Sequence, residues 1–438
     1  QNNLPERGTA YCIAEDHVNA NLLFAGTEFG VYVSIDGGQK WIQLKGGLPT
    51  IAVKDMNIQK RENDLILATF GRGFYVMDDY TPLRNLKKED LDKAATIFPV
   101  KDAWMYVESL PLGVRGKGFQ GENFFTTPNP KVGAVFTYYL KDDIKTIKEK
   151  RRDAEKEKIK KGEAPYYPSI DSLRLEDEQP APHLLFTVMD ENNNIVRRIK
   201  APAKKGLNRI VWDFRYAPFG PVDLTQFDES FVFSSPEIGY MALPGNYKVS
   251  LSKFEDGIYT ELVSPQPFKT SALNYATLPA TDKKALDDFC KKIAELRRVS
   301  AAADEYRGEL VNKIKYIKQA IIETPKLATG ISKSIADLDK RLTGVNTQLN
   351  GDATLARREF ETVPSINGRI GSIIGALWNT TAAPTTTFMN SYSIAAKQFT
   401  PVYNELKAIG DEIRKLEIEL EKSNAPYTPG RLPEWKGN

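Results

Sequence analysis

Two kinds of side chain that build metal centres are scarce in this sequence, which holds two cysteines and two histidines. Two cysteines cannot form a structural zinc site, and His17 and His183 stand alone without the spacing of metal ligands. A disulfide between Cys12 and Cys290 is one alternative, but their wide separation in the chain favours two independent thiols. We therefore expect no metal and no other cofactor.

Long apolar runs and an excess of one charge are also missing. No stretch of about 18 apolar residues occurs, so the sequence does not predict a membrane-spanning helix. The net charge is +3, from 60 basic and 57 acidic residues, which gives no electrostatic reason to bind nucleic acid. The first residues lack the basic and apolar segments of a signal peptide. We expect either that a signal has been removed or that the sequence begins inside a longer protein.

Common catalytic signatures are absent as well. There is no G-x-S-x-G nucleophile elbow, P-loop, H-E-x-x-H motif or dinucleotide fingerprint. What the sequence does contain is ordinary globular material, with 41% hydrophobic and 27% charged residues in a chain of 438. That length exceeds one compact domain, so about two to four domains are expected.

Residues 1–86 have the strand-and-turn pattern of an all-β domain, with short apolar stretches separated by Gly, Asn and Asp. They also contain a repeat, because LLFAGTEFGVYVSIDGG from Leu22 returns as LILATFGRGFYVMDD from Leu65, with Thr27 and Thr69 42 residues apart. Four short strands at this period are typical of a propeller blade. Since one and a half blades cannot bury their own faces, we expect further blades upstream in the same protein or in another chain.

The first repeat leads into an S-x-D-x-G-x-x-W motif formed by Ser34, Asp36, Gly38 and Trp41. This pattern is typical of an Asp-box turn, in which the carboxylate accepts backbone N–H groups and the glycine adopts a conformation that other residues avoid. Ser34 can add a side-chain hydrogen bond, and Trp41 is expected to pack beneath the turn. The motif therefore predicts a structural role and supplies no catalytic residue.

A second β region follows a linker predicted over 87–132. The apolar runs between 133 and 272, separated by turns, predict a β-sandwich of the immunoglobulin or fibronectin type III kind. Residues 141–168 interrupt this sandwich with a dense run of charged side chains, which is typical of a solvated helix or a mobile insertion. A basic docking element for an anionic partner is the alternative.

From Thr281 onward the pattern becomes helical. Thr281 and Asp282 are typical N-cap residues, and apolar side chains then recur at spacings of three and four through three long segments and a shorter one at 366–377. These stripes predict an antiparallel helical bundle over 281–422, with an intermolecular coiled coil as the alternative. The proline-rich tail 423–438 is not expected to be helical. The predicted fold class is thus multidomain: propeller blades and a β-sandwich, followed by an all-α bundle.

The segments AGTEFGVYVSIDGGQKW, GGLP and ATFGRGFYVMDD together resemble the last propeller blades of the sortilin-like (VPS10-type) BNR-repeat proteins that Bacteroidota secrete, which are often labelled glycosyl hydrolases. LPGNYKVSL and the terminal PYTPGRLPEW look like the sandwich and the helical region of the same family. The resemblance covers nearly the whole chain. It implies an exported protein, secreted, at the cell surface or in the periplasm, with its remaining blades upstream.

Two residues outside the Asp box are candidate site residues. Arg72 lies between two glycines and is a candidate binding residue, although an ion pair with Asp78 or Asp79 at the blade edge explains it better. Ser172 fits the short D-S/T-apolar pattern of O-glycosylation in Bacteroidota. Sialidases share Asp boxes but need an arginine triad, a tyrosine nucleophile and an acidic partner. No such arrangement can be recognised here, so no catalytic residue is assigned.

The favoured hypothesis is a non-catalytic C-terminal part of a secreted or cell-surface propeller protein that acts in protein or glycan binding or scaffolding. One alternative is the accessory half of a sialidase-like glycoside hydrolase with its active site in upstream blades. A subunit of an outer-membrane or secretion assembly is the other. The expected partners are upstream blades of the same protein, and a glycan or another cell-surface protein.

Overall fold

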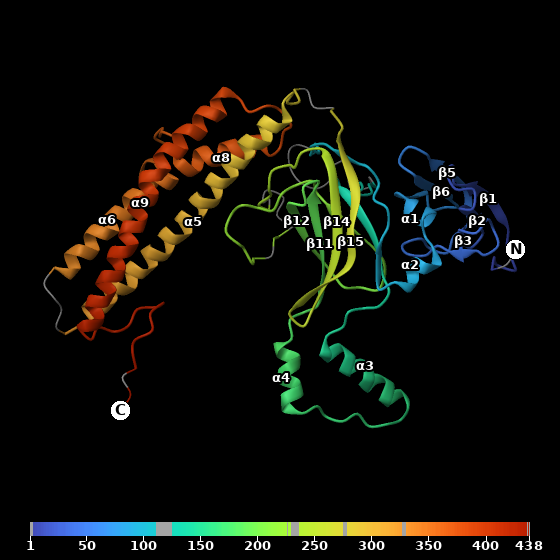
Figure 1. Cartoon of the computed structure of the whole chain (residues 1–438), viewed down its shortest axis with the longest axis horizontal. Coiled ribbons are helices and arrows are strands. Elements are labelled where there is room, and N and C mark those ends of the chain that lie inside the picture. Colours follow the sequence, from blue (N-terminus) through green and yellow to red (C-terminus); the bar gives the residue numbers. More distant parts are fainter. Residues whose placement is uncertain are drawn as a thin grey trace. The chain divides into compact units, whose positions relative to one another are not determined.

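The computed structural model describes residues 3–110, 125–225, 227–228, 236–274, 278–325, 330–435 and 437. The chain divides into two compact units (Figure 1). Sheets dominate the first unit and long helices the second, which confirms the predicted fold class of blades and sandwich followed by a helical bundle. The first unit comprises Gln1–Met105, Asn123–Phe214 and Pro244–Ala272, and the second Tyr106–Glu122, Arg215–Leu243 and Leu273–Asn438.

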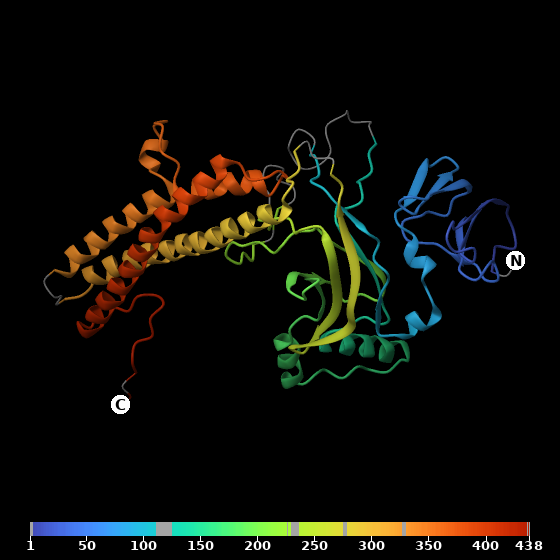
Figure 2. The ribbon, with the colours of Figure 1, turned by 45° about the horizontal axis from the view of Figure 1, so that its top comes forward.

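Two antiparallel sheets at the start of the first unit form the blades (Figure 2). The first sheet has four strands: β1 (Ala10–Glu15), β2 (Leu23–Thr27), β3 (Gly30–Ser34) and β4 (Ile42–Gln43). The second has three: β5 (Val53–Gln59), β6 (Asp64–Thr69) and β7 (Phe74–Met77). Because of the sequence repeat, the same hydrogen bond from a threonine side chain closes a hairpin in both sheets. Thr27 Oγ1 donates to the carbonyl of Gly30 at 3.0 Å, and Thr69 Oγ1 donates to that of Gly73 at 2.7 Å.

The two blades stack face to face over one apolar core. Phe24, Val31 and Val33 of the first sheet pack with Leu65 and Leu67 of the second. Because side chains alternate between the faces of a strand, these residues mark one face of each sheet as buried. The stack explains why the apolar positions of the repeat return at a fixed period.

A β-sandwich forms the rest of the first unit. Its strands are β8 (Ala95–Ile97), β9 (Ala103–Met105), β10 (Ala134–Leu140), β11 (His183–Asp190), β12 (Ile195–Ala201), β13 (Gly206–Trp212), β14 (Gly245–Glu255) and β15 (Ile258–Ala272). One sheet has the order β13-β10-β8 and the other β12-β11-β14-β15-β9. Aromatic rings fill the core. Phe136 stacks on Phe186 with 6.3 Å between ring centroids, and the fully buried Trp212 lies 5.0 Å from Tyr247.

The segment 87–132, predicted as a linker, contributes strands to both sheets. β8 pairs with β10, and β9 pairs in parallel with β15. Each of these strands has only three residues, so no alternation of apolar and polar residues marks it in the sequence. Two short helices, α1 (Thr81–Arg84) and α2 (Lys88–Asp92), lead from the blades to β8. Residues 111–124 of the predicted linker lie outside the described residues.

The charged insertion predicted over 141–168 forms helix α3 (Ile147–Lys160), and α4 (Ile170–Glu178) follows it before β11. Thr146 and Glu149 form a capping box at the start of α3. No side chain of α3 is fully buried, as its composition leads one to expect. Arg151 holds the two helices together, because its Nε lies 2.5 Å and its Nη2 2.9 Å from the carboxylate of Glu176.

The helices of the second unit pack side by side around a core of leucine, isoleucine and valine (Figures 1 and 2). They are α5 (Lys283–Ile322), α6 (Ile331–Asn350), α8 (Ile366–Leu377) and α9 (Thr386–Lys422), whereas the short α7 (Ala353–Ala356) between α6 and α8 contributes no buried residue. Asp282 caps α5 by accepting a hydrogen bond from the backbone N–H of Ala285 at 2.9 Å. Most buried residues of these helices belong to the apolar stripes of the sequence, and Asp287, Ser300 and Glu417 are buried beside them.

The proline-rich tail lies along α9. Thr428 is buried, its hydroxyl lies 3.4 Å from Oε1 of Glu417, and Arg431 forms an ion pair with Glu421. Within the described ranges, none of the helices combines the length and the apolar character needed to cross a membrane.

Candidate functional site

The Asp-box residues form a closed hydrogen-bonded turn between β3 and β4. The hydroxyl of Ser34, which is buried, donates to Asp36 Oδ1 at 2.7 Å and accepts the backbone N–H of Gly38 at 2.8 Å. Asp36 Oδ1 also accepts the backbone N–H of Lys40 at 3.0 Å. Gly38 has a φ of 89°, a conformation that residues with a Cβ rarely adopt. Trp41 is buried against Ala25 and Tyr32.

These contacts give Asp36 a structural task. The backbone N–H of Lys40 and the hydroxyl of Ser34 lower the pKa of Asp36, because both donate to its ionised form. A general acid needs a raised pKa and an open approach to a substrate proton. The Asp36 carboxylate instead has its Oδ1 committed to the turn, so the arrangement suits a lock on the hairpin.

A buried carboxylate that the sequence analysis did not single out ties the two ends of the blade region together. Asp16, between β1 and β2, accepts hydrogen bonds from the hydroxyl of Tyr80 at 2.6 Å and from Nε of Arg84 at 2.8 Å. Its Oδ2 also accepts the backbone N–H of Asn19 at 2.8 Å. Arg84 reaches Asn63 Oδ1 at 2.9 Å as well. We call Asp16, Tyr80 and Arg84 the Asp16 network.

The electrostatics of the Asp16 network are those of a structural ion pair. Burial alone would raise the pKa of Asp16, but the hydrogen bonds from Arg84, Tyr80 and the backbone of Asn19 outweigh it and lower the pKa to about 2. Burial and the neighbouring Asp16 carboxylate raise the pKa of Tyr80. The Asp16 side chain has no exposed surface, so a substrate cannot reach it. This arrangement suits a structural role for the network in the blades.

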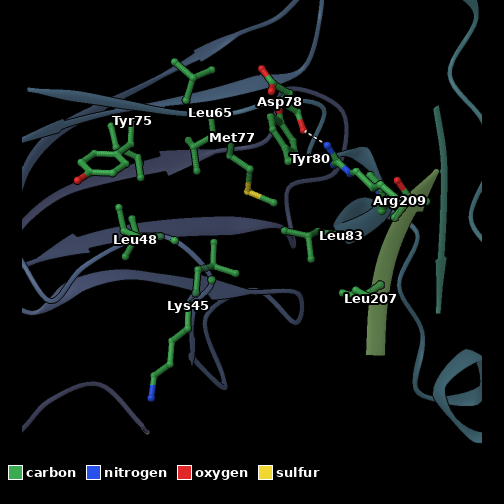
Figure 3. Close-up of a pocket in the computed structure, with 18 of the residues that line it drawn as sticks. Lys45, Leu48, Leu65, Tyr75, Met77, Asp78, Tyr80, Leu83, Leu207 and Arg209 are labelled. Atoms are coloured by element: carbon green, nitrogen blue, oxygen red, sulfur yellow. Dashed lines mark hydrogen bonds between the residues drawn. The ribbon is translucent and has the colours of Figure 1, made fainter. Parts of the chain in front are cut away.

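A cavity of about 610 Å³ lies in the first unit beside the second blade (Figure 3). Most of its wall is apolar, and Leu44, Leu48, Leu65, Met77 and Leu207 belong to it. The wall draws on β3, the segment after β4, β6, β7, α1 and the sandwich strand β13. An apolar cavity of this size with a few polar groups at its margin is the usual form of a binding site.

Polar groups at the edge of the cavity connect the residues that follow β7 to the strand β13. Arg209 Nη1 donates to the backbone carbonyl of Asp78 at 2.8 Å (Figure 3), and Nη2 donates to that of Asp79 at 2.5 Å. Burial and the nearby carboxylate of Asp64 raise the pKa of Asp78. Lys45 supplies a further cation to the wall. Asp78 and Arg209 are 131 residues apart, so no local pattern could have shown that they meet.

The structure places the remaining candidate residues at the surface. Arg72 is exposed in the turn between β6 and β7, and it is not part of the cavity wall. In the part of the chain that the structure describes, Arg72 forms no ion pair with Asp78 or Asp79, and the backbone carbonyls of these two residues accept hydrogen bonds from Arg209. Ser172 is exposed in the first turn of α4, 2.9 Å from the hydroxyl of Ser169; its glycosylation stays a prediction. Cys12 and Cys290 are free thiols.

Comparisons with known proteins give only distant likenesses. No protein-family model matches the chain, and no curated protein matches it. One similar solved structure is the extracellular domain of a hybrid two-component system protein from B. thetaiotaomicron, with 12% identity, 61% of this chain and 26% of that chain covered, and a TM-score of 0.14. Another is PorZ, a surface component of the type-IX secretion system of Porphyromonas gingivalis, with 13% identity, 60% and 30% covered, and a TM-score of 0.16.

This chain therefore spans less than a third of the length of those structures. At these TM-scores the likeness carries no argument about the fold or the function of this chain.

Proposed function

We propose that this chain is a non-catalytic part of a secreted or cell-surface propeller protein, and that it binds a further β-sheet through the outer face of its second blade. The observation that supports the proposal is the exposure of that face. Phe74 is 76% exposed and Val76 is 55% exposed, although both lie in a strand of a regular sheet.

In the first blade, the equivalent face is covered by a neighbouring sheet. Val31 and Val33 follow the hairpin glycine of the first repeat as Phe74 and Val76 follow Gly73 in the second. Val31 is 1% exposed and Val33 is 4% exposed, because the second blade covers them. Equivalent positions of the repeat are thus buried in one blade and open in the other. Fully burying such side chains contributes about 1.5–3 kcal/mol each, so the open face is a strong candidate for an interface.

The interface between the two blades also indicates the chemistry of the partner. Leu65, Leu67 and Tyr75 of the second blade cover the first. A partner that covers the second blade in the same way would present a sheet with a similar apolar face, and repeat proteins stack identical units by such interfaces. Further blades of the same protein, as in the BNR-repeat family that the sequence resembles, fit this description. The assembled propeller would then offer a face for a glycan or another surface protein.

The proposal is tested by placing a photo-crosslinking amino acid at Phe74 in the 438-residue chain and expressing it together with the native cell-surface proteins. The expected result is a specific adduct with a polypeptide that contains blade-type repeats. Tyr259 is a matched control, since it is an aromatic residue of the sandwich that is 54% exposed, and no equivalent adduct is expected there. Equal adducts at both positions, or hydrolysis of sialylated or other glycans by this chain, would contradict the proposal.

A further inference from the structure

The two blades differ in the number of their strands. The first has the order β1-β2-β3-β4, whereas the second has the order β5-β6-β7. In the first blade β4 pairs with the outer edge of β3, with Tyr32 opposite Gln43 and Val33 opposite Ile42. Within the described ranges, β6 is the one strand that pairs with β7. The outer edge of β7 therefore presents backbone groups that in the first blade are bonded to a fourth strand.

The register of the hairpin identifies these backbone groups. The carbonyl of Val31 points outward and accepts the backbone N–H of Leu44 at 2.9 Å. Phe74 is the equivalent of Val31, and the N–H of Thr69 donates to the carbonyl of Gly73 on the inner side. Since residues of an antiparallel strand alternate between its two neighbours, Phe74 and Val76 direct their N–H and C=O groups to the open edge. Unpaired groups of this kind are a template for another strand.

The cavity described above lies where a fourth strand would run. Leu44 and Leu48, from the segment that contains and follows β4 of the first blade, form one side of it. Tyr75 and Met77 of β7 form another, and Leu207 of β13 lies beyond them (Figure 3). In a stack of blades the fourth strand of one packs beside the fourth strand of the next. The cavity therefore lies between the segment that follows β4 and the strand β7, where a fourth strand of the second blade would run.

Arg209 limits how far along β7 an added strand can pair. Its guanidinium binds the carbonyls of Asp78 and Asp79, and the carbonyl of Asp78 is the group that a longer added strand would use next. An added strand would therefore pair with Phe74 to Val76 and stop before Asp78. About four residues, some 13 Å of extended chain, are enough to cover this length.

We infer that the edge of β7 accepts a short extended strand supplied from outside these 438 residues, with apolar side chains directed into the cavity. Main-chain hydrogen bonds to Phe74 and Val76 would provide affinity, and the apolar wall around Leu44 and Leu48 would select the side chains. The pairing of β4 with β3 is the model for this contact. The inference concerns the edge of β7, and it is independent of what covers the exposed face of the same strand.

A labelled synthetic peptide with the sequence of residues 39–46, QKWIQLKG, is a suitable probe because it contains the strand that occupies the equivalent edge. Fluorescence anisotropy with the 438-residue chain is expected to show saturable binding, and hydrogen exchange is expected to slow at residues 74–77. A peptide N-methylated at the leucine N–H should bind at least about tenfold more weakly, a loss of about 1.4 kcal/mol. This control leaves the protein unchanged.

Two variants of the protein distinguish binding at the backbone edge of β7 from binding at the exposed face of the same strand. Val76→Pro removes an outward N–H and should weaken binding of the peptide to a similar degree, whereas Phe74→Ser alters the exposed face and should leave it within about threefold. Absence of saturable binding, equal affinity of the N-methylated peptide, or protection away from β7 would overturn the inference. So would a concentration-dependent dimer in sedimentation that Val76→Pro abolishes, because the strand would then come from a second copy of the chain.

Discussion

Replacement of Asp16 by asparagine should destabilise the blades more than the rest of the chain. The substitution keeps the size of the side chain but removes the charge that faces Arg84, whose own side chain is 16% exposed. Removing one partner of a buried ion pair typically costs about 3–5 kcal/mol, because the remaining charge is left without compensation. The Asp16→Asn variant is therefore expected to lose stability of that order in the blades at pH 7.

The pH dependence of the same variant provides a sharper test. The pKa of Asp16 is about 2 in the folded chain against an ordinary value of 3.8. A lowered pKa stabilises the folded state above the ordinary pKa, by about 2.4 kcal/mol at pH 7 for this difference. This contribution disappears as the pH falls, with about 1 kcal/mol lost by pH 3. Between pH 5 and pH 3 the natural chain should therefore lose about 1 kcal/mol more than Asp16→Asn, in which the lowered pKa values of Asp36 and Glu62 still produce a loss of their own.

Urea unfolding followed by hydrogen-exchange mass spectrometry can report residues 10–77 separately from the sandwich and the bundle. Tyr80→Phe is the matched control, since it removes one hydroxyl donor to Asp16 and should cost about 1 kcal/mol, while the hydrogen bonds from Arg84 and the backbone of Asn19 keep part of the pH dependence. If Asp16→Asn unfolds the blades at the same urea concentration as the natural chain, or loses as much stability as the natural chain between pH 5 and pH 3, the account of the Asp16 network is wrong.

Two further substitutions test local packing. In the bundle, a methyl group at Gly410 would clash with the hydroxyl group of Tyr306, whereas one at Gly344 meets nothing within 4 Å. Gly410→Ala should therefore cost about 1–3 kcal/mol and Gly344→Ala should gain up to about 1 kcal/mol, as measured by thermal unfolding with circular dichroism; shifts of the same sign would contradict this packing. In the Asp box, Ser34→Ala removes the acceptor for the N–H of Gly38. It should cost about 1–3 kcal/mol and speed amide exchange at Gly38, and an unchanged exchange rate there would show that the turn does not depend on Ser34.

Features carried by short stretches of sequence were predictable. The repeat that begins at Leu22 and Leu65 gave the two blades, and the S-x-D-x-G-x-x-W motif pointed to the turn whose bonds to Ser34 and Asp36 the structure shows. The stripes of the helical region correspond to the buried residues of α5, α6, α8 and α9. In each case the pattern works because neighbouring residues obey the geometry of one strand, turn or helix.

The strands β8 and β9 were missed because each is three residues long and acquires its place only by pairing with β10 or β15. The candidate site was missed for a related reason. Its wall combines residues from β3 through α1 with Leu207 and Arg209 of the sandwich, and the exposure of Phe74 cannot be told from that of Val31 in the sequence.

By itself, then, the sequence determined which segments become strands and helices and which turn locks the first hairpin, because these follow from local periodicity and backbone preference. The tertiary structure decided which faces are covered and which edges are free. It also brought Asp16 to Arg84 across 68 residues and Arg209 to Asp78 across 131. Contacts of this kind depend on how the whole chain closes on itself, and no short segment contains that information.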